Sequence, residues 1–371
     1  MKVVITGAHG FIGKNLVPRL LSESGLKLVE ITRQDSLDDF YTEIIEADWI
    51  VHLAGVSRPE SDEEFQSINV GYTSRLCDIA SNADAAIPII FASSTQAENQ
   101  TLYGKSKLSA ENILKAHASD AGCKTLIYRL PGIFGKWCKP NYNSVVATFC
   151  HNISHGLPIQ VDNETTSLTL NYIDDVVGDM LSCILGEKEI HEQTAYLTVE
   201  PLHEISLRSL VSTLEGFRDN RNNLKVEQVG SGLKRALYAT YMSYLDVADF
   251  SYEIASHSDD RGRFVEFVKT RNSGQVSYFT AGPGVSRGRH YHHTKTEKFL
   301  VVRGEACFRF KQLHTERFYE QKISSDDSRI IESIPGWAHD VTNTGESELI
   351  ILVWASEVFD RNRPDTIPEE V

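Results

Sequence analysis

The chain has 371 residues, which is enough for two domains that each bury a core of their own. Its 37 basic and 51 acidic residues give a net charge of −14, which argues against a binding surface for nucleic acid or for an anionic membrane. No apolar run approaches the roughly 20 residues that span a bilayer, and the six cysteines form no CxxC pair, so we expect a soluble cytoplasmic protein with free thiols.

The first predicted element is a short apolar strand at residues 2–6, which leaves no room for a signal peptide. A glycine-rich turn follows, and helical periodicity then runs over residues 14–22. In such a unit the first glycine allows a tight turn, the second lets the backbone approach a pyrophosphate, and the third lets the helix pack on the strand. The pattern predicts a dinucleotide-binding turn formed by Gly7, Gly10, Phe11, Ile12 and Gly13.

The residue after the second predicted strand, at residues 26–32, bears on the choice of cofactor. A site for NADH usually places an acidic residue there, which binds the ribose 2′-hydroxyl. This sequence has Arg33, whose guanidinium can pair with a 2′-phosphate. We therefore predict NADPH, with NADH as the alternative because Asp35 lies close by.

A strand predicted over residues 87–92 leads to Ser94 and Thr95, at the edge where open α/β sheets bind ligands. Tyr103 and Lys107 come next in the chain, and residues four apart share one face of a helix. A nearby ammonium favours the phenolate, so it would lower the tyrosine pKa from about 10. We predict that Tyr103 donates a proton to a carbonyl oxygen and that Ser94, or alternatively Thr95, hydrogen-bonds to the same oxygen.

The G-x2-G-x2-G turn and the Y-x3-K pair resemble the extended short-chain dehydrogenase/reductases over about residues 1–243. The resemblance implies a Rossmann-type, doubly wound parallel sheet that binds a nicotinamide dinucleotide. It places the catalytic pair described above against the cofactor as well. It also implies that the turn after the strand at residues 49–53 borders the nicotinamide ribose, through Leu53, Ala54 and Gly55.

Three further segments are interpreted through the same family. Asn69 is expected to support the fold and a proton-relay water, or else to be an ordinary surface asparagine. Arg129 and Gly135 match the family's R-x2-N-V-Y-G stretch, but Gly132 stands where asparagine is frequent, so we assign no substrate contact there. Residues 203–219 are predicted to form an amphipathic helix that packs in the smaller, substrate-covering part.

The pattern changes beyond residue 243. Short alternating runs with glycine- or asparagine-rich turns predict an antiparallel sandwich or barrel over residues 244–371. The runs that we expect to form strands are residues 263–268, 275–279, 298–302, 306–310, 328–334 and 348–355. We therefore expect an all-β domain after the α/β domain.

Four metal-ligating residues lie within the predicted β domain. His290 and His292 alternate along a strand and share one face, Glu297 begins the next strand, and His339 comes from a distant strand. Three imidazoles and one carboxylate suit a first-row divalent metal, and the same set can hold zinc, iron, manganese or nickel. The sequence therefore predicts a metal site.

The spacing of these ligands resembles the first cupin motif at every defined position, ending at Gly304. The second motif is matched only from Gly336 onward, through His339 to Asn343. The resemblance implies a cupin domain, a double-stranded β-helix. Residues 259–262, Asp-Asp-Arg-Gly, also look like the D-x-R-G segment of cupin nucleotide-sugar epimerases that act on 4-keto-6-deoxy sugars, or are an acidic turn.

The order of the two domains resembles the bifunctional capsular-polysaccharide enzymes of the CapF type. This resemblance implies that the cupin domain epimerises a UDP-4-keto-6-deoxy-hexosamine at C3 and that the reductase domain then reduces C4 with NADPH. The product would be UDP-2-acetamido-2,6-dideoxy-L-talose, towards UDP-N-acetyl-L-fucosamine. We expect Zn²⁺ because epimerisation needs no redox step, and a homodimer because both domain families often pair.

Two other functions stay open at this point. The cupin domain could bind sugar or join subunits without catalysis, so that only the reductase domain is an enzyme. It could also be an iron dioxygenase, because the ligand set permits that metal. The residue that would remove the C3 proton is not identified by the sequence, and five polar side chains are equal candidates: Tyr291, His293, Lys295, Lys298 and His314.

Overall fold

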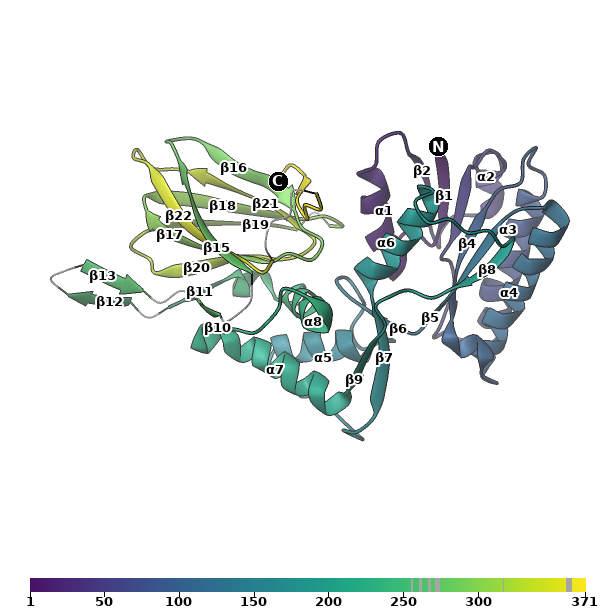
Figure 1. Cartoon of the computed structure of the whole chain (residues 1–371), viewed down its shortest axis with the longest axis horizontal. Coiled ribbons are helices and arrows are strands. Elements are labelled where there is room, and N and C mark those ends of the chain that lie inside the picture. Colours follow the sequence, from purple (N-terminus) through teal and green to yellow (C-terminus); the bar gives the residue numbers. More distant parts are fainter. Residues whose placement is uncertain (255, 260–261, 266–267, 271–273, 316, 358–361) are drawn as a thin grey trace. The chain divides into compact units, whose positions relative to one another are not determined.

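A computed structural model describes the chain except residues 255, 260–261, 266–267, 271–273, 316 and 358–361 (Figure 1). It forms two compact units, Met1–Ser144 with Leu168–Glu204 and Val145–Ser167 with Ile205–Val371. The second unit thus contains helices from before residue 244 as well as the β-rich part after it, and the boundary predicted there stays a prediction. Among the described residues, no helix is long and apolar enough to cross a membrane.

The first unit is built on a parallel sheet with the strand order β2-β1-β3-β4-β5-β8. Its strands are β1 (Lys2–Thr6), β2 (Lys27–Ile31), β3 (Trp49–His52), β4 (Ile89–Ser94), β5 (Thr125–Leu130) and β8 (Thr194–Leu197). All six residues of β4 are buried, because helices cover both faces of the sheet. The predicted Rossmann-type, doubly wound fold is confirmed.

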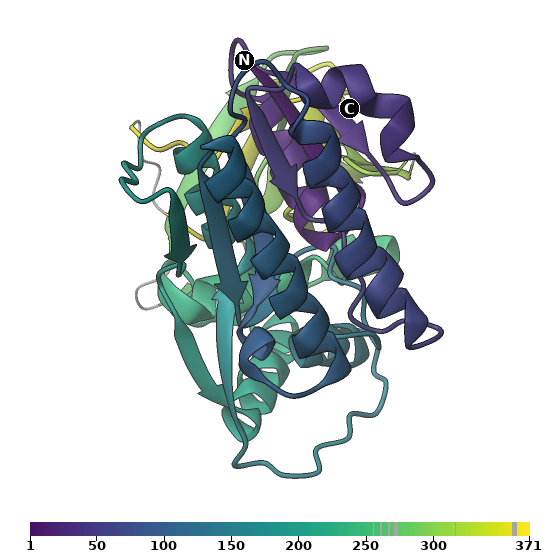
Figure 2. The same cartoon turned by 90° about the vertical axis from the view of Figure 1, so that its right-hand side faces the viewer.

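Helices α2, α3 and α4 lie on one side of this sheet and share a core with it, while α1 and α6 pack together on the other side (Figure 1). Figure 2 shows α3 and α4 side by side in front of the sheet. The helical segments of this unit are α1 (Phe11–Leu21), η1 (Leu37–Phe40), α2 (Tyr41–Ile45), η2 (Phe65–Gly71), α3 (Tyr72–Ala80), η3 (Thr95–Glu98), α4 (Leu102–Ala121) and α6 (Ile173–Ile184).

The helix predicted over residues 203–219 is wrong at its start. Residues His203–Ser206 form strand β9, and helix α7 runs from Leu207 to Asn223. The Ser206 side chain accepts a hydrogen bond from the Ser209 backbone N–H, and this N-cap fixes where the helix begins. Two more short strands, β6 (Gly132–Phe134) and β7 (Ser167–Tyr172), pair in parallel. Gly132 is thus a strand residue, paired with Leu170.

The second unit consists of helices and an all-β part. Two antiparallel five-stranded sheets have the orders β11-β20-β17-β22-β15 and β19-β18-β21-β16-β23, which agrees with the predicted cupin fold. Their strands are β11 (Ser251–Glu253), β15 (Gln275–Ala281), β16 (Ser286–Tyr291), β17 (Glu297–Arg303), β18 (Glu305–Gln312), β19 (Phe318–Ser324), β20 (Arg329–Ser333), β21 (Trp337–Asn343), β22 (Leu349–Ala355) and β23 (Ile367–Pro368).

The remaining elements of this unit are α5 (Val145–Ser154), α8 (Gly232–Met242), η4 (Val247–Phe250), β10 (Lys225–Val226), β12 (Ser256–Asp259), β13 (Gly262–Val265) and β14 (Lys269–Thr270). The D-x-R-G resemblance falls partly on residues 260 and 261, which lie outside the described residues. Aromatic rings fill the space between the two five-stranded sheets. Phe299 of β17 lies 5.6 Å from Phe308 of β18, measured between ring centres.

Candidate active site and metal centre

The glycine turn between β1 and α1 has the geometry that the sequence predicts. Gly7 has φ +71°, and a Cβ atom there would lie 2.7 Å from the Ala54 backbone nitrogen. A Cβ atom on Gly13 would lie 2.2 Å from the Ala8 carbonyl oxygen, so only glycine fits at either position. Gly10 is the N-cap of α1 and supplies no side-chain hydrogen bond. The amides of the first turn, which includes Phe11 and Ile12, therefore suit an anionic ligand such as a pyrophosphate.

The turn after β3 lies against this glycine turn and against α4. The backbone N–H of Leu53 donates to the Thr6 carbonyl at 3.0 Å, and that of Ala54 donates to the Thr6 hydroxyl at 3.3 Å. A Cβ atom on Gly55 would lie 3.2 Å from Lys107 Nζ. The backbone of this turn thus lies close to the predicted catalytic lysine. That the turn borders the nicotinamide ribose stays a prediction.

Asn69 holds this turn to helix α4. Its Oδ1 accepts from the Val56 N–H at 2.7 Å, and its Nδ2 donates to the Val56 carbonyl and to Ser106 Oγ, both at 2.9 Å. Asn69 is only 2% exposed. The alternative of a surface asparagine is therefore wrong, and the expected supporting role agrees with these contacts.

Ser94 and Thr95 differ clearly in their surroundings. Ser94 ends β4, is buried, and forms a hydrogen bond with the Tyr103 side chain, whereas Thr95 is exposed at the start of η3. Tyr103 lies in the first turn of α4, where Thr101 caps the helix by accepting from the Gly104 N–H at 3.0 Å. Of the two hydroxyls that the sequence left open, the structure brings Ser94 to the tyrosine.

Lys107 lies one helical turn beyond Tyr103 and is buried. Its Nζ donates to the Ala92 carbonyl at 2.8 Å and lies 4.7 Å from the centre of the Phe91 ring. Burial lowers the pKa of Lys107 to about 8, although Glu111 opposes this. The expected lowering of the Tyr103 pKa is not found. Burial raises this pKa more than the hydrogen bond with Ser94 lowers it.

The two residues relevant to the choice of cofactor have different partners. The Arg33 side chain is 81% exposed and lies 3.9 Å from the Glu64 carboxylate. The Asp35 carboxylate accepts from the hydroxyl and the backbone N–H of Thr32, both at 2.7 Å, and these hydrogen bonds lower the pKa of Asp35. Asp35 is therefore engaged within its own turn, while the Arg33 guanidinium reaches solvent.

The four predicted metal ligands come together in the β-rich part. Their ligand atoms all lie within 4.8 Å of one another, and His290 pairs with His339 across β16 and β21. Glu297 Oε2 lies 3.1 Å from His292 Nε2 and 3.3 Å from His339 Nε2. Nitrogen and carboxylate ligands facing one point at these separations fit a divalent metal ion.

Burial and neighbouring groups shift the pKa values of three of the four ligands towards the ligating protonation state. Burial lowers the pKa of His290 to about 4, with further lowering by His339 and His292. Burial also lowers the pKa of His339. For Glu297 burial favours the protonated acid, but the charges and hydrogen bonds of His292 and His339 keep its pKa well below 4.5. Imidazoles must be neutral and the carboxylate ionised to bind a metal, so the pKa shifts of His290, His339 and Glu297 each favour the ligating form.

The sequence did not identify the residues that orient these ligands. Ser333 Oγ lies 3.2 Å from Nδ1 of His339, and the Asp365 carbonyl bonds to Nδ1 of His292. Such partners fix the ring so that Nε2 faces the metal. Ser333 stands opposite Glu297 in the β17–β20 register, a relation that depends on strand pairing and leaves no spacing motif.

The structure reduces the set of candidates for the epimerisation base. Lys298 is buried in an ion pair with Glu332, the residue opposite it in the β17–β20 register. Because Lys298 directly follows the ligand Glu297 in β17, its side chain points to the other face of the sheet. Lys295 Nζ donates to the Thr366 hydroxyl at 3.0 Å. Tyr291 and His293 are buried and make an edge contact with ring centres 5.3 Å apart. Both lysines are therefore engaged by other side chains, and Tyr291, which directly follows His290 in β16, alternates away from the ligand face as Lys298 does.

Comparisons with known proteins agree with this two-part arrangement. Residues 3–196 match the NAD dependent epimerase/dehydratase family, and residues 257–367 match the polysaccharide biosynthesis C-terminal domain. A curated relative from Pseudomonas aeruginosa, UDP-2-acetamido-2,6-beta-L-arabino-hexul-4-ose reductase, is 48% identical over 366 residues, which cover 99% of this chain and 98% of the relative.

Solved structures also resemble this chain, one over its whole length and another over part of it. The capsular polysaccharide assembling protein CapF from Staphylococcus aureus is 39% identical, with a TM-score of 0.67 and coverage of 100% of both chains. UDP-glucuronic acid 4-epimerase from Bacillus cereus, solved with NAD, is 19% identical and covers 59% of this chain and 84% of its own, with a TM-score of 0.52. This second likeness concerns the fold alone. The chain therefore belongs to the NAD dependent epimerase/dehydratase family, which implies a nicotinamide cofactor, and within it to the CapF-like proteins that carry a polysaccharide biosynthesis C-terminal domain.

Proposed function

We propose that the chain is an NADPH-dependent nucleotide-sugar 4-ketoreductase that also epimerises its substrate at C3. The substrate would be a UDP-4-keto-6-deoxy-hexosamine and the product UDP-2-acetamido-2,6-dideoxy-L-talose, towards UDP-N-acetyl-L-fucosamine for capsular polysaccharide. One observation carries the proposal: a single chain holds a serine–tyrosine pair with a buried lysine and also four clustered metal-ligating side chains. The name of the Pseudomonas relative, a reductase of a UDP-linked hexul-4-ose, supports the choice of substrate.

In the reductase site each side chain has a distinct role. A reduced nicotinamide, when bound at the glycine turn, supplies the hydride for C4. Because burial raises the pKa of Tyr103, its hydroxyl is protonated at neutral pH and can donate that proton to the C4 oxygen. Ser94 hydrogen-bonds to Tyr103 and can hold the same oxygen. The Lys107 ammonium, fixed by the Ala92 carbonyl, would offset the negative charge left on the tyrosine.

The preference for NADPH rests on Arg33. Its guanidinium is exposed, and the nearby Asp35 carboxylate is engaged by Thr32. A charge-assisted hydrogen bond contributes about 1.5–3 kcal/mol, so Arg33→Ala should raise KM for NADPH about 10- to 100-fold. KM for NADH should stay unchanged. Steady-state kinetics with both cofactors test this, and an equal loss with both would contradict a role in 2′-phosphate binding.

For the cupin part we propose Zn²⁺ as the metal and C3 epimerisation as the reaction. The ion, when bound, supplies a positive charge that polarises a substrate ketone and acidifies the adjacent C–H. The pKa shifts of Glu297, His290 and His339 favour their metal-binding protonation states. The rings of Phe299 and Phe310, whose centres lie 5.9 and 6.0 Å from that of His339, keep its surroundings apolar.

The experiment that tests the proposal separates the two reactions. The protein receives a UDP-4-keto-6-deoxy-hexosamine in heavy water without NADPH, and NMR follows the C3 proton. Deuterium entering C3, and stopping when a chelator removes the metal, is the expected result. If no exchange occurs while NADPH is oxidised normally after its addition, the chain is a single-function reductase with a non-catalytic cupin.

Two substitutions then assign the reactions to their residues. Tyr103→Phe should abolish NADPH oxidation and leave C3 exchange intact, whereas His339→Ala should stop exchange and leave slow reduction of the unepimerised ketone. Tyr278→Phe is the matched control, because this tyrosine is 69% exposed on the edge strand β15. Loss of both reactions in either variant, with the protein folded and cofactor bound, would contradict the proposed division.

A further inference from the structure

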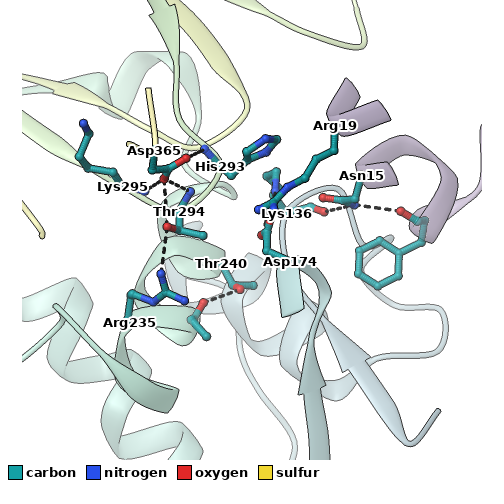
Figure 3. Close-up of polar contacts among 12 residues, drawn as sticks. Asn15, Arg19, Lys136, Asp174, Arg235, Thr240, His293, Thr294, Lys295 and Asp365 are labelled. Carbon is teal, nitrogen blue, oxygen red and sulfur yellow. Dashed lines mark hydrogen bonds and ion pairs between the residues drawn. The ribbon is translucent and has the colours of Figure 1, made fainter. Parts of the chain in front are cut away.

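The loop of residues 293–296 joins two of the metal ligands, His292 and Glu297, and is held by one carboxylate. Asp365 accepts hydrogen bonds from three successive backbone N–H groups, those of His293, Thr294 and Lys295, each at 2.8 Å (Figure 3). The Thr294 hydroxyl donates to the same carboxylate at 3.0 Å. Successive N–H groups that converge in this way form a concave anion site. Here the chain fills that site with its own aspartate.

Asp365 also contacts a metal ligand through its backbone. Its carbonyl oxygen bonds to Nδ1 of His292. A carbonyl oxygen can only accept, so Nδ1 carries the proton, and in the neutral ring Nε2 is the atom left to bind a metal. That Nε2 lies 3.1 Å from Glu297 Oε2. One residue therefore fixes both the tautomer of His292 and the loop that leads to Glu297.

The residues after Asp365 extend the same attachment. Thr366 accepts from Lys295 Nζ at 3.0 Å, and strand β23 pairs with β16 with Pro368 opposite His290. The Glu369 N–H donates to the Arg289 carbonyl at 2.9 Å. This segment, residues 365–369, thus contacts the strand that carries one ligand and the loop that joins two others. Within this segment, the Asp365 side chain accepts the four hydrogen bonds described above.

We propose that Asp365 is a positioning residue for the metal site, which holds His292 and the 293–296 loop in the ligating geometry. This inference rests on the proposed function in one respect, the binding of a divalent metal by the His3Glu set. Residues that orient metal ligands typically change metal affinity about 10- to 100-fold when they are replaced. We therefore expect Asp365→Asn, in which an NH2 group faces the backbone donors, to weaken Zn²⁺ binding by about this factor.

The test measures metal binding rather than turnover. Chelator-treated full-length protein is titrated with Zn²⁺ against a competing fluorescent chelator, for the wild type and for Asp365→Asn. Glu370→Gln is the matched control, because this nearby carboxylate is 80% exposed and its ion pair with Arg289 is long, at 3.7 Å. The visible spectrum of the Co²⁺-loaded proteins reports ligand geometry, and thermal unfolding of the metal-free proteins reports the fold.

The inference predicts weaker Zn²⁺ binding and an altered Co²⁺ spectrum for Asp365→Asn, with no change for Glu370→Gln. If the wild type binds Zn²⁺ and Asp365→Asn binds it equally well, the positioning role is overturned while the proposed function stands. A lower unfolding temperature with an unchanged Co²⁺ spectrum overturns it too. If the wild type does not bind Zn²⁺, the metal part of the proposed function fails and the inference fails with it.

A second variant covers the case in which Asp365→Asn does not fold. Thr294→Val removes one of the four hydrogen bonds to the carboxylate and leaves the three backbone donors in place. Zn²⁺ affinity should then fall by less than in Asp365→Asn but measurably below the wild type. Affinity equal to that of the wild type would overturn the inference here as well.

Discussion

The ion pair between Lys298 and Glu332 allows a quantitative prediction for the β-rich part. Glu332 is 1% exposed and Lys298 is 4% exposed. Glu332 also pairs with Arg221 of α7, and Lys298 Nζ donates to the Tyr252 hydroxyl at 3.0 Å. Removing one partner of a buried pair leaves an uncompensated charge and typically costs about 3–5 kcal/mol. Glu332→Leu should therefore lower the free energy of unfolding of this part by about 3–5 kcal/mol.

Two further variants isolate the cause. The double variant Lys298→Met/Glu332→Leu should recover most of the lost stability, because apolar residues of similar volume replace both charges. Arg221 then has no carboxylate partner at this position, but its side chain is partly exposed. Glu253→Leu is the surface control. Its partner Arg329 is 3.4 Å away and the carboxylate side chain is 78% exposed, so the cost should stay within about 1 kcal/mol.

The assay is urea unfolding followed by the fluorescence of the buried Trp337 and Trp354 of this part, with Trp49 and Trp137 contributing from the other unit. Burial favours the protonated acid, but Arg221 and Lys298 outweigh it and lower the pKa of Glu332. Its contribution is therefore complete above pH 4.5 and fades as the pH falls through the lowered pKa. A Glu332→Leu variant as stable as Glu253→Leu at pH 7 would refute this reasoning.

Three other predictions concern the α/β unit. Gly13→Ala should abolish NADPH binding in a fluorescence titration, because its methyl group would lie 2.2 Å from the Ala8 carbonyl oxygen, and binding as in the wild type would contradict this. Ser94→Ala should lower kcat for ketone reduction about 10- to 100-fold, while Thr95→Ala, changed at an exposed position, should not. Since burial lowers the pKa of Lys107 to about 8, kcat/KM for reduction should fall as the pH rises above 8, and a profile flat to pH 10 would contradict a need for the ammonium.

The features that the sequence predicts well are those with a local period. The turn at Gly7 is recognisable because a strand precedes it and a helix follows it. Tyr103 and Lys107 are found from their helical spacing, and His290 and His292 from strand alternation, and the structure brings each pair to one site. Local sequence patterns therefore identified these candidate residues without knowledge of the tertiary fold.

The rest depends on features that a linear pattern does not contain. Whether Ser94 or Thr95 faces Tyr103 is decided by where β4 ends, and the serine is its last residue. The direction of the Tyr103 pKa shift depends on burial, which outweighs the hydrogen bond with Ser94. Asp365 lies 72 residues from His293 in the chain, and only the folded β-sandwich brings them together.

Helix α4 has a consequence for the way this protein tolerates change. Tyr103, Lys107 and Glu111 lie four residues apart along it, and Glu111 is fully buried, where it receives the Arg129 guanidinium. One inserted or deleted residue would turn everything beyond it by about 100° and shift it by about 1.5 Å. The tyrosine, the lysine and the buried carboxylate would then lose their common alignment in one step. Insertions and deletions between residues 103 and 111 should thus be eliminated under selection, while substitutions at the exposed Lys105 and Leu108 persist.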